Sequence, residues 1–501
     1  MNQPIFDKVL TVLLLTPVLC ASLLLLGRGG RSLTKASAIA QALITALLIL
    51  SYDTGKSGYQ FVCSTNPLVP DLGMALSLGV DGLGLMMLVL TALVTLAAVW
   101  FSPVVETRPR VFDACVLLIS AGATGAFAAK DLFFFYAFHE LALIPTFLLI
   151  GLWGSGERQA AAWKITVYLA LGSIVLLAGL VDLFLSIPKA HRSFDLEALQ
   201  KVALAGLIPA EHQLRPWLLL MAGFGVLISL FPFHSWAAPA YASAPTPAAM
   251  LHAGVLKKFG LYGVVRLVVP FLPEALKQPL WGTWTAHDVL LLALLGNILY
   301  VGLVTLSQRK LDWVIGFSSV MHMGYAFLGI ASANLIGLSG TCLLMFAHGL
   351  SVAALFGMVG YLREQEGSLS FERLSGTMTR APFLGICFAM AAFASIGLPG
   401  FANFASETLV FFGSFQTGGS TMLRTSTILA LWGVVISAVY MLRAYRIAFL
   451  GKPLDSSAGW RDLSGGARWT LIALLTALLL AGCFPSMLLA YIKPSLEAVL
   501  R

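Results

Sequence analysis

The sequence is poor in charged residues. Asp, Glu, Lys and Arg make up 11% of its 501 residues, whereas 58% are hydrophobic. A soluble domain has roughly a quarter charged residues, so this composition excludes a soluble globular protein. Apolar runs of roughly 20 residues, the length that crosses a bilayer as a helix, recur along the whole chain. We therefore predict an all-α polytopic membrane protein.

The sequence also lacks the motifs that hold redox cofactors. Its six cysteines are scattered, and none forms a CxxC pair, which argues against an iron–sulfur cluster, a zinc site or a redox motif. No glycine-rich loop follows a predicted strand, as a flavin or nicotinamide site would require. We expect free thiols in apolar helices, and neither a cofactor nor a metal ion in this chain.

The hydrophobic pattern places about fourteen spans. Residues 228–254 contain four prolines, which cannot all lie in continuous helix because each lacks an N–H donor. Residues 393–415 are interrupted by Pro399 and Gly400. The predicted spans lie near 9–26, 33–51, 80–101, 111–128, 131–152, 161–186, 216–235, 245–271, 286–306, 312–331, 336–362, 382–416, 426–450 and 470–492.

The two interrupted segments suggest an internal repeat. Broken helices at membrane depth are tolerated where protein buries them or where they line a wet cavity, and breaks at corresponding places in two halves indicate inverted repeats with the working site at the breaks. The breaks lie about five spans apart. We therefore divide the chain into three N-terminal helices (1–110), two five-helix repeats (111–271 and 286–450) and a C-terminal helix (451–501).

The net charge of +8 does not indicate nucleic-acid binding, because the basic residues lie in short loops between spans. Lysine and arginine are richer in every second loop, beginning with the one that contains Arg28 and Arg31. The exception is one long loop on the opposite side, which holds Lys189, Arg192, Lys201 and Arg215. Loops rich in lysine and arginine remain in the cytoplasm. This pattern predicts that both termini lie on the non-cytoplasmic side.

A few ionisable residues interrupt the apolar spans. A charge at membrane depth is costly and usually faces the interior of the bundle with a functional role. The alternative for a single histidine is a core residue bonded to a backbone carbonyl. The alternative for one of the two adjacent lysines is a side chain that extends toward the headgroups. The candidates are Glu140, Lys257, Lys258, His322, His348 and Glu407, joined by His139, His234 and His252.

The set as a whole predicts a route for protons or another cation. It has no metal-ligand spacing and no nucleophile triad. Burial disfavours the charged form of each group, which brings groups with distant solution pKa values toward a common range, and histidine titrates near neutrality already. A chain of such groups across the membrane core suits proton transfer, with Glu140 as one station.

Five stretches resemble the antiporter-like membrane subunits of respiratory complex I, and most closely the M type. They fall in the family's order over roughly residues 75–450, and Glu407 stands where the sister L and N types carry a lysine. The stretches are FFFYAFHELALIPTFLLIGLWG, PFHSWAAPAYASAPTPAAMLHAGVLKKFGLYGVVRL, GFSSVMHMGYAFLGI, MFAHGLSVAALF and GLPGFANFASETLVFFGSFQ.

The resemblance implies fourteen helices in two inverted five-helix repeats, with helices seven and twelve broken. It implies proton translocation driven by NADH:quinone chemistry in other subunits, partnership with L-, N- and K-type subunits, and a place in the bacterial inner membrane. Glu140 would match the family's helix-five glutamate, Lys258 the central lysine and Glu407 the terminal group. His322 and His348 would match the linking histidines.

This chain departs from the family at one important position. The family has a helix-seven lysine that pairs with the helix-five glutamate, and Leu227 stands there instead. We hypothesise that another cation serves Glu140, with His252 as the main candidate and His139 and Lys257 as the others. The competing interpretations are a structural paralogue with altered pumping, a hydrogenase-type membrane subunit and a multisubunit cation/proton antiporter.

Overall fold

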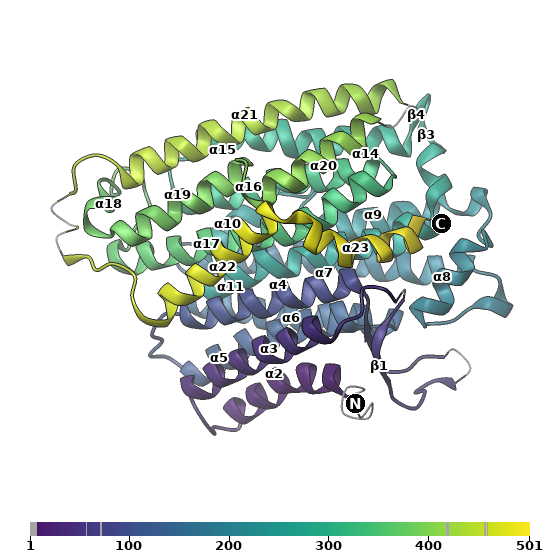
Figure 1. Cartoon of the computed structure of the whole chain (residues 1–501), viewed down its shortest axis with the longest axis horizontal. Coiled ribbons are helices and arrows are strands. Elements are labelled where there is room, and N and C mark those ends of the chain that lie inside the picture. Colours follow the sequence, from purple (N-terminus) through teal and green to yellow (C-terminus); the bar gives the residue numbers. More distant parts are fainter. Residues whose placement is uncertain are drawn as a thin grey trace.

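The computed structural model describes residues 8–56, 58–70, 73–416, 420–454, 457 and 459–500. Both termini, for which the sequence predicts a non-cytoplasmic location, end in residues outside this part (1–7 and 501). The described chain is a bundle of long helices that run side by side (Figure 1). Both small β hairpins and α8 lie at one end of the bundle, and α18 lies at the other (Figure 1).

The helices before the first break follow the predicted spans closely. They are α2 (Val9–Leu25), α3 (Arg31–Ser51), α4 (Gly82–Trp100), α5 (Pro109–Ala128), α6 (Leu132–Trp153), α7 (Arg158–Ser186), the loop helix α8 (Leu196–Leu204) and α9 (Leu214–Ile228), with short 3₁₀ turns η2 (Lys189–His191) and η3 (Ala210–His212).

The following segment includes the predicted span 245–271 and the loop after it. It contains α10 (Ala237–Ser243), α11 (Thr246–Leu251), η4 (His252–Leu256), α12 (Lys257–Gly263), η5 (Val264–Val268), α13 (Val269–Phe271) and the 3₁₀ turn η6 (Pro273–Lys277). Here η4 and η5 are π-helical. This span is therefore an α-helix widened twice by π segments, a feature often found at functional sites.

The remaining helices follow from residue 286 to the C-terminal end of the described chain. It contains α14 (Ala286–Leu295), the π-helical η7 (Gly296–Val301), α15 (Gly302–Ser307), α16 (Leu311–Ala331), α17 (Leu335–Glu366), α18 (Thr377–Arg380), α19 (Pro382–Ile396), α20 (Ala402–Gln416), α21 (Thr421–Phe449), α22 (Gly465–Cys483) and α23 (Pro485–Leu500).

Two antiparallel hairpins complete the described chain. Strand β1 (Gln60–Ser64) pairs with β2 (Ser77–Val80), and β3 (Pro279–Trp281) pairs with β4 (Trp284–Thr285). Several helices begin at an acidic or amide side chain that caps their free N–H groups. Asp131 accepts from Phe133 N and Phe134 N at the start of α6, and Asn334 accepts from Gly337 N at the start of α17.

Both predicted helix breaks are confirmed. Helix α9 ends at Ile228, Ser229 adopts a left-handed φ of 65°, and helical structure resumes in α10. Helix α19 ends at Ile396, Gly397 has φ 82°, and α20 follows. A Cβ at Gly397 would lie 2.5 Å from Glu407 Oε2, so this glycine is required both for its φ and for the close approach.

Ten helices of the described chain are long and apolar enough to cross a membrane. The other predicted spans are the shorter α2, the two broken helices (α9 with α10, and α19 with α20) and the segment from α11 to α13. The fold therefore agrees with a polytopic all-α protein of about fourteen spans. Helices α16 and α17 are the centre of the bundle, because their apolar windows are wholly buried.

The prediction for the C-terminus was wrong in one respect. Instead of a single span near 470–492, α22 ends at Cys483 and a separate helix, α23, begins at Pro485. Proline has no N–H to continue the preceding helix but fits a first helical position. The segment 451–501 therefore contains two helices.

Candidate functional site: a buried line of ionisable residues

Lys258 lies at the centre of the site. It follows η4 directly, at the start of α12, and its side chain is completely buried. Its Nζ lies 2.5 Å from the carbonyl oxygen of Ala253 and 2.9 Å from Nδ1 of His348 on α17. When Lys258 carries its charge, the ammonium group can only donate, so His348 Nδ1 then accepts and the imidazole proton lies on Nε2.

His322 on α16 lies next along the line. Its ring centroid is 5.4 Å from that of His348. Its Nδ1 lies 2.7 Å from the carbonyl oxygen of Ser318, and its Nε2 lies 2.8 Å from the carbonyl oxygen of Ser395. Carbonyl oxygens only accept, so both contacts are hydrogen bonds at once when both ring nitrogens carry hydrogen. The imidazole of His322 thus links α16 to the end of α19.

Glu407 on α20 ends the line just past the second break. Its side chain is buried, and its Oε1 lies 3.9 Å from His322 Nε2. This Oε1 has no hydrogen-bond partner among the described residues. Four predicted site residues, Lys258, His348, His322 and Glu407, are therefore brought together in one line across α12, α17, α16 and α20.

Lys257 does not extend to the headgroups, so that alternative was wrong. Its side chain is as buried as that of Lys258. Its Nζ lies 3.3 Å from Ser319 Oγ on α16 and 5.2 Å from the centre of the Tyr241 ring. Consecutive residues point about 100° apart on a helix, which is why the two lysines contact different helices.

Glu140 is less buried than the sequence predicts. About a third of its side chain (35%) is exposed in the single chain, because it borders an open groove of about 300 Å³ between α6 and α7. Its carboxylate contacts His139 Nδ1 at 3.2 Å and accepts a hydrogen bond from the Ser173 hydroxyl, which lies 3.2 Å from the Tyr136 hydroxyl.

The structure brings His139, and not His252, to Glu140. His139 is buried and its ring stacks on Phe259 with a centroid distance of 4.3 Å. His252 instead lies with its Nδ1 3.4 Å from the Tyr241 hydroxyl. The structure thus places His252, in η4, beside α10, and the hypothesis that His252 serves Glu140 stays a prediction.

Leu227 is buried in apolar surroundings at the position of the expected lysine. Its helix α9 packs on α12 through aromatic contacts, with the Phe224 and Phe259 rings 6.3 Å apart. His234 stays in the first break, stacked on Phe231, apart from the line. Among the described residues, no group of three or more His, Cys, Asp or Glu side chains could hold a metal ion.

Two important polar residues escaped the sequence analysis. Arg266 in η5 forms a buried ion pair with Asp81, the N-cap of α4, and lies 5.0 Å from the centre of the Tyr262 ring. The available signal was an arginine inside the predicted span 245–271. Asn297 in η7 is completely buried and forms hydrogen bonds with backbone groups of the first helix break. Its sequence signal was weak, because an amide in an apolar span is less unusual than a charge.

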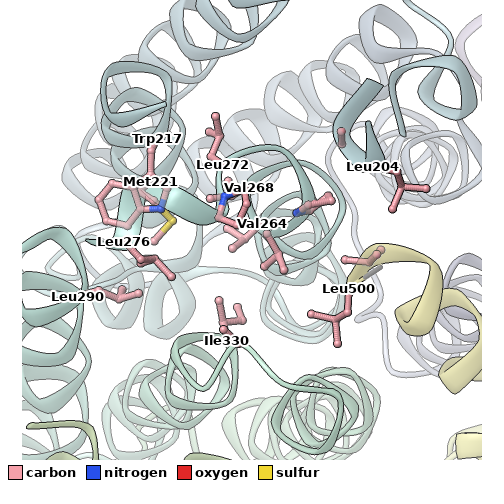
Figure 2. Close-up of a pocket in the computed structure, with 16 residues that line it drawn as sticks. Leu204, Trp217, Met221, Val264, Val268, Leu272, Leu276, Leu290, Ile330 and Leu500 are labelled. Atoms are coloured by element: carbon pink, nitrogen blue, oxygen red, sulfur yellow. The ribbon is translucent and has the colours of Figure 1, made fainter. Parts of the chain in front are cut away.

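A separate cavity of about 290 Å³ contains no ionisable side chain. It lies between α8, α9, α14 and the end of α23, and Trp217, Leu276 and Leu500 are among the apolar side chains that line it (Figure 2). Because an apolar cavity does not hold water or protons readily, we do not include it in the candidate site.

Fold and site together define a class: a polytopic membrane protein with two broken helices whose interior holds a line of lysine, histidine and carboxylate groups. Residues 129–433 match the family described as NADH:quinone oxidoreductase/Mrp antiporter, TM. The chain belongs to this family, as the resemblance of its motifs led us to expect.

Relatives match nearly the whole chain. The protein named NAD(P)H-quinone oxidoreductase chain 4 2 from Thermosynechococcus vestitus is 34% identical over 489 residues, which cover 95% of this chain and 89% of that protein. NADH-quinone oxidoreductase subunit M from Rickettsia felis is 30% identical, covering 93% and 91%. These relatives are of the chain 4 or M type.

Solved structures of two membrane complexes contain chains with a similar fold. A chain of respiratory complex I from Thermus thermophilus matches with a TM-score of 0.86 at 28% identity, covering 98% of this chain and 100% of that one. A chain of the Mrp complex from Dietzia has a TM-score of 0.83 at 18% identity, covers 100% of both chains and shares the fold.

Proposed function

We propose that this chain is the proton-translocating M-type subunit in the membrane arm of a NADH:quinone oxidoreductase, with the redox chemistry in other subunits. The observation that carries this proposal is the line from Lys258 through His348 and His322 to Glu407, whose members are buried and have no ion pair closer than 3.9 Å among the described residues. Groups without a fixed counter-charge are not held in one protonation state by an ion pair, so they are available to gain and lose protons.

Each residue has a role in this scheme. Glu140 receives or releases a proton beside the groove between α6 and α7, and His252 is a station near Lys257. Lys258 is the central carrier and passes a proton to His348 across their 2.9 Å contact. His322 links His348 to Glu407, the terminal group. Gaps longer than a hydrogen bond are bridged by water molecules or by side-chain rotation.

The same proposal includes the assembly. Its partners are L-, N- and K-type membrane subunits in a hetero-oligomer in the bacterial inner membrane. The repeats span residues 111–271 and 286–450, and both termini lie on the non-cytoplasmic side. The family match, the helix order and the two breaks support this arrangement.

Co-purification with proton uptake tests the function. A tagged chain is isolated with its native assembly in mild detergent, and NADH:quinone activity is measured together with proton uptake in liposomes. We expect Glu407→Gln to lower coupled proton uptake about tenfold or more, since it removes a proton-transfer group. Glu157→Gln, a change at an exposed carboxylate, is the matched control.

Two outcomes contradict the proposal. Unchanged pumping in Glu407→Gln removes this residue from the route. Isolation of the tagged chain without NADH activity points instead to a hydrogenase-type or multisubunit cation/proton antiporter complex, and the companion subunits would show which.

We further propose that His139 supplies the positive partner of Glu140 that Leu227 cannot provide. The 3.2 Å contact between His139 and Glu140 supports this. His139→Leu is expected to abolish coupled proton uptake. His252→Leu is expected to have the same effect, because His252 is proposed as a station of the route. Normal pumping in His252→Leu would exclude His252 from the route and leave His139 as the histidine that serves Glu140.

Leu227 also favours a second candidate, a structural paralogue that no longer pumps. In that case His139→Leu, His252→Leu and Glu407→Gln would all leave the proton yield of the assembly unchanged, while deletion of the chain would still disrupt assembly.

A further inference from the structure

A cavity of about 480 Å³ whose lining includes several basic side chains lies apart from the buried line. It is formed where α4 ends at Trp100 and where α3 and α5 begin, and its lining includes the cations Arg31, Lys35 and Arg110. Helix ends mark the level of the membrane surface, so we place this cavity at the boundary between hydrocarbon and water.

Arg31 holds the wall of the cavity in place. It forms an ion pair with Asp113 and donates to the carbonyl oxygens of Val99 (3.1 Å) and Ser102 (2.9 Å). These bonds join the start of α3 to the end of α4 and to α5. The charge of Asp113 is thereby balanced within the cavity.

The other two cations form no direct ion pair among the described residues, and the single carboxylate in the lining, Asp113, is already bonded to Arg31. Lys35 Nζ lies 5.5 Å from the centre of the Trp100 ring, and Arg110 Nε donates to Gly29 O at 3.2 Å. Neither forms an ion pair with any residue that the structure describes. The cavity therefore has an excess of positive charge, to which the adjoining first turns of α3 and α5 add their partial charges.

An apolar stripe runs along α3 away from the cavity. Starting from Lys35, every third or fourth residue is an exposed aliphatic side chain, which places them on one face of the helix. From residue 35 to residue 50 the stripe measures about 23 Å, more than half the roughly 30 Å hydrocarbon core. Its members are Ile39 (43% exposed), Leu43 (61%), Leu47 (56%) and Leu50 (83%).

We propose that this cavity binds the phosphate headgroup of an anionic phospholipid, whose acyl chain lies along the stripe of α3. Arginine and lysine are the usual partners of phosphate oxygens, and basic pockets between membrane helices recognise anionic lipid headgroups. A free phosphate ion shares the headgroup chemistry but does not explain the apolar stripe. The proposal is independent of the proton route, because none of its residues belongs to the buried line.

A photo-crosslinking experiment on the intact purified assembly tests the proposal. The assembly is reconstituted in nanodiscs containing either phosphatidylglycerol or phosphatidylcholine with a photoreactive group in the acyl chain, and the crosslinked residues are identified by mass spectrometry. We expect the phosphatidylglycerol probe to label residues 39–50, and the phosphatidylcholine probe to label them far less.

The double variant Lys35→Gln/Arg110→Gln should lower labelling by the anionic probe roughly tenfold, because two attractive charges are lost. The matched control Arg28→Gln/Arg108→Gln removes two exposed cations that lie just before α3 and α5, outside the cavity, and should leave labelling unchanged. Arg31 is not varied, because its loss would disturb the packing of α3 on α5.

Three results would overturn the proposal. Equal labelling by the two probes would show that charge is not recognised, and an equal loss in both double variants would show an unspecific surface effect. If excess inorganic phosphate abolished labelling of α3, the cavity would be a site for free phosphate and not for a lipid.

Discussion

Ionisable side chains in this protein fall into two groups with different surroundings. Near the helix ends they are paired: Arg363 bonds Asp312 at 2.9 Å, Lys130 bonds Glu197 at 3.1 Å, and Arg266 bonds Asp81. In the centre, the line from Lys258 to Glu407 has no such pairs. A tight ion pair fixes the protonation state of both partners, whereas an isolated buried group can change its own. The first group stabilises the fold and the second is available for proton transfer.

The pair between Arg266 and Asp81 gives a stability prediction. Arg266→Gln leaves a buried carboxylate without its cation, which costs about 3–5 kcal/mol, and should lower the unfolding temperature of the detergent-purified assembly. The double variant Asp81→Asn/Arg266→Gln removes both charges and keeps an N-cap side chain for α4. It should be more stable than Arg266→Gln alone.

The matched control is Arg215→Gln. Arg215 also forms an ion pair with an aspartate, Asp182, but its side chain is 79% exposed. Water replaces such a partner readily, so we expect no measurable change in the unfolding temperature. Equal destabilisation by Arg215→Gln and Arg266→Gln would contradict the idea that burial decides the cost.

At the scale of elements, both broken helices are held by a polar side chain from another helix, η7 or α16. Asn297 of η7 accepts from Phe231 N at 2.5 Å and donates to Ser229 O at 3.1 Å and Val320 O at 2.8 Å. At the second break, His322 contacts Ser395 O. Backbone groups freed by a break cannot find bulk water at membrane depth, so side chains must satisfy them. Since His322 is titratable, its protonation is linked to the geometry of the second break.

Asn297→Leu tests the role of the first of these contacts. It leaves backbone groups of the break unsatisfied in a buried place, each at a cost of about 1–3 kcal/mol. We expect a lower unfolding temperature and less proton uptake per quinone reduced. Thr305→Val, in the same span, is the control, because the Thr305 hydroxyl bonds only Val301 O of its own helix. Equal stability of the two variants would show that the break does not depend on Asn297.

The whole molecule has two distinct ends. The end with the β hairpins holds the loops between α3 and α4 and between α13 and α14, and the opposite end holds the loops that follow α2, α4 and α17 (Figure 1). Apart from the long loop between α7 and α9, the loops rich in lysine and arginine are those of the second end, and the charge rule predicts that this end faces the cytoplasm. The proposed lipid cavity lies at this same end.

Cysteine labelling in intact cells tests this orientation. Trp281 in the β3–β4 hairpin and Val104 in the loop after α4 are well exposed, by 85% and 98% respectively. A membrane-impermeant maleimide should label Trp281→Cys in intact cells and Val104→Cys only after permeabilisation, with the unsubstituted chain as the background. The reverse pattern would invert the predicted topology and place the basic cavity on the outer side.

Much of the fold could be predicted from the sequence. The lengths of the apolar runs set the spans, and the prolines together with Gly400 indicated the two breaks, because these effects are local to the chain. The separate helix α23 was missed because an apolar run extends across Pro485, and the π segments were missed because their residues have the same hydrophobic pattern as an α-helix.

The sequence by itself determined the class of protein, the two broken helices and the types of residue that can carry protons, because composition and backbone chemistry act locally. Only the tertiary structure decided which of these residues meet. In the folded chain Lys258 contacts His348, the carboxylate of Glu140 contacts His139, and Arg266 pairs with Asp81, which lies 185 positions away in the sequence. The physical reason is that contacts between helices depend on the rotation and packing of each helix, which the π segments and breaks change by amounts that no local pattern records.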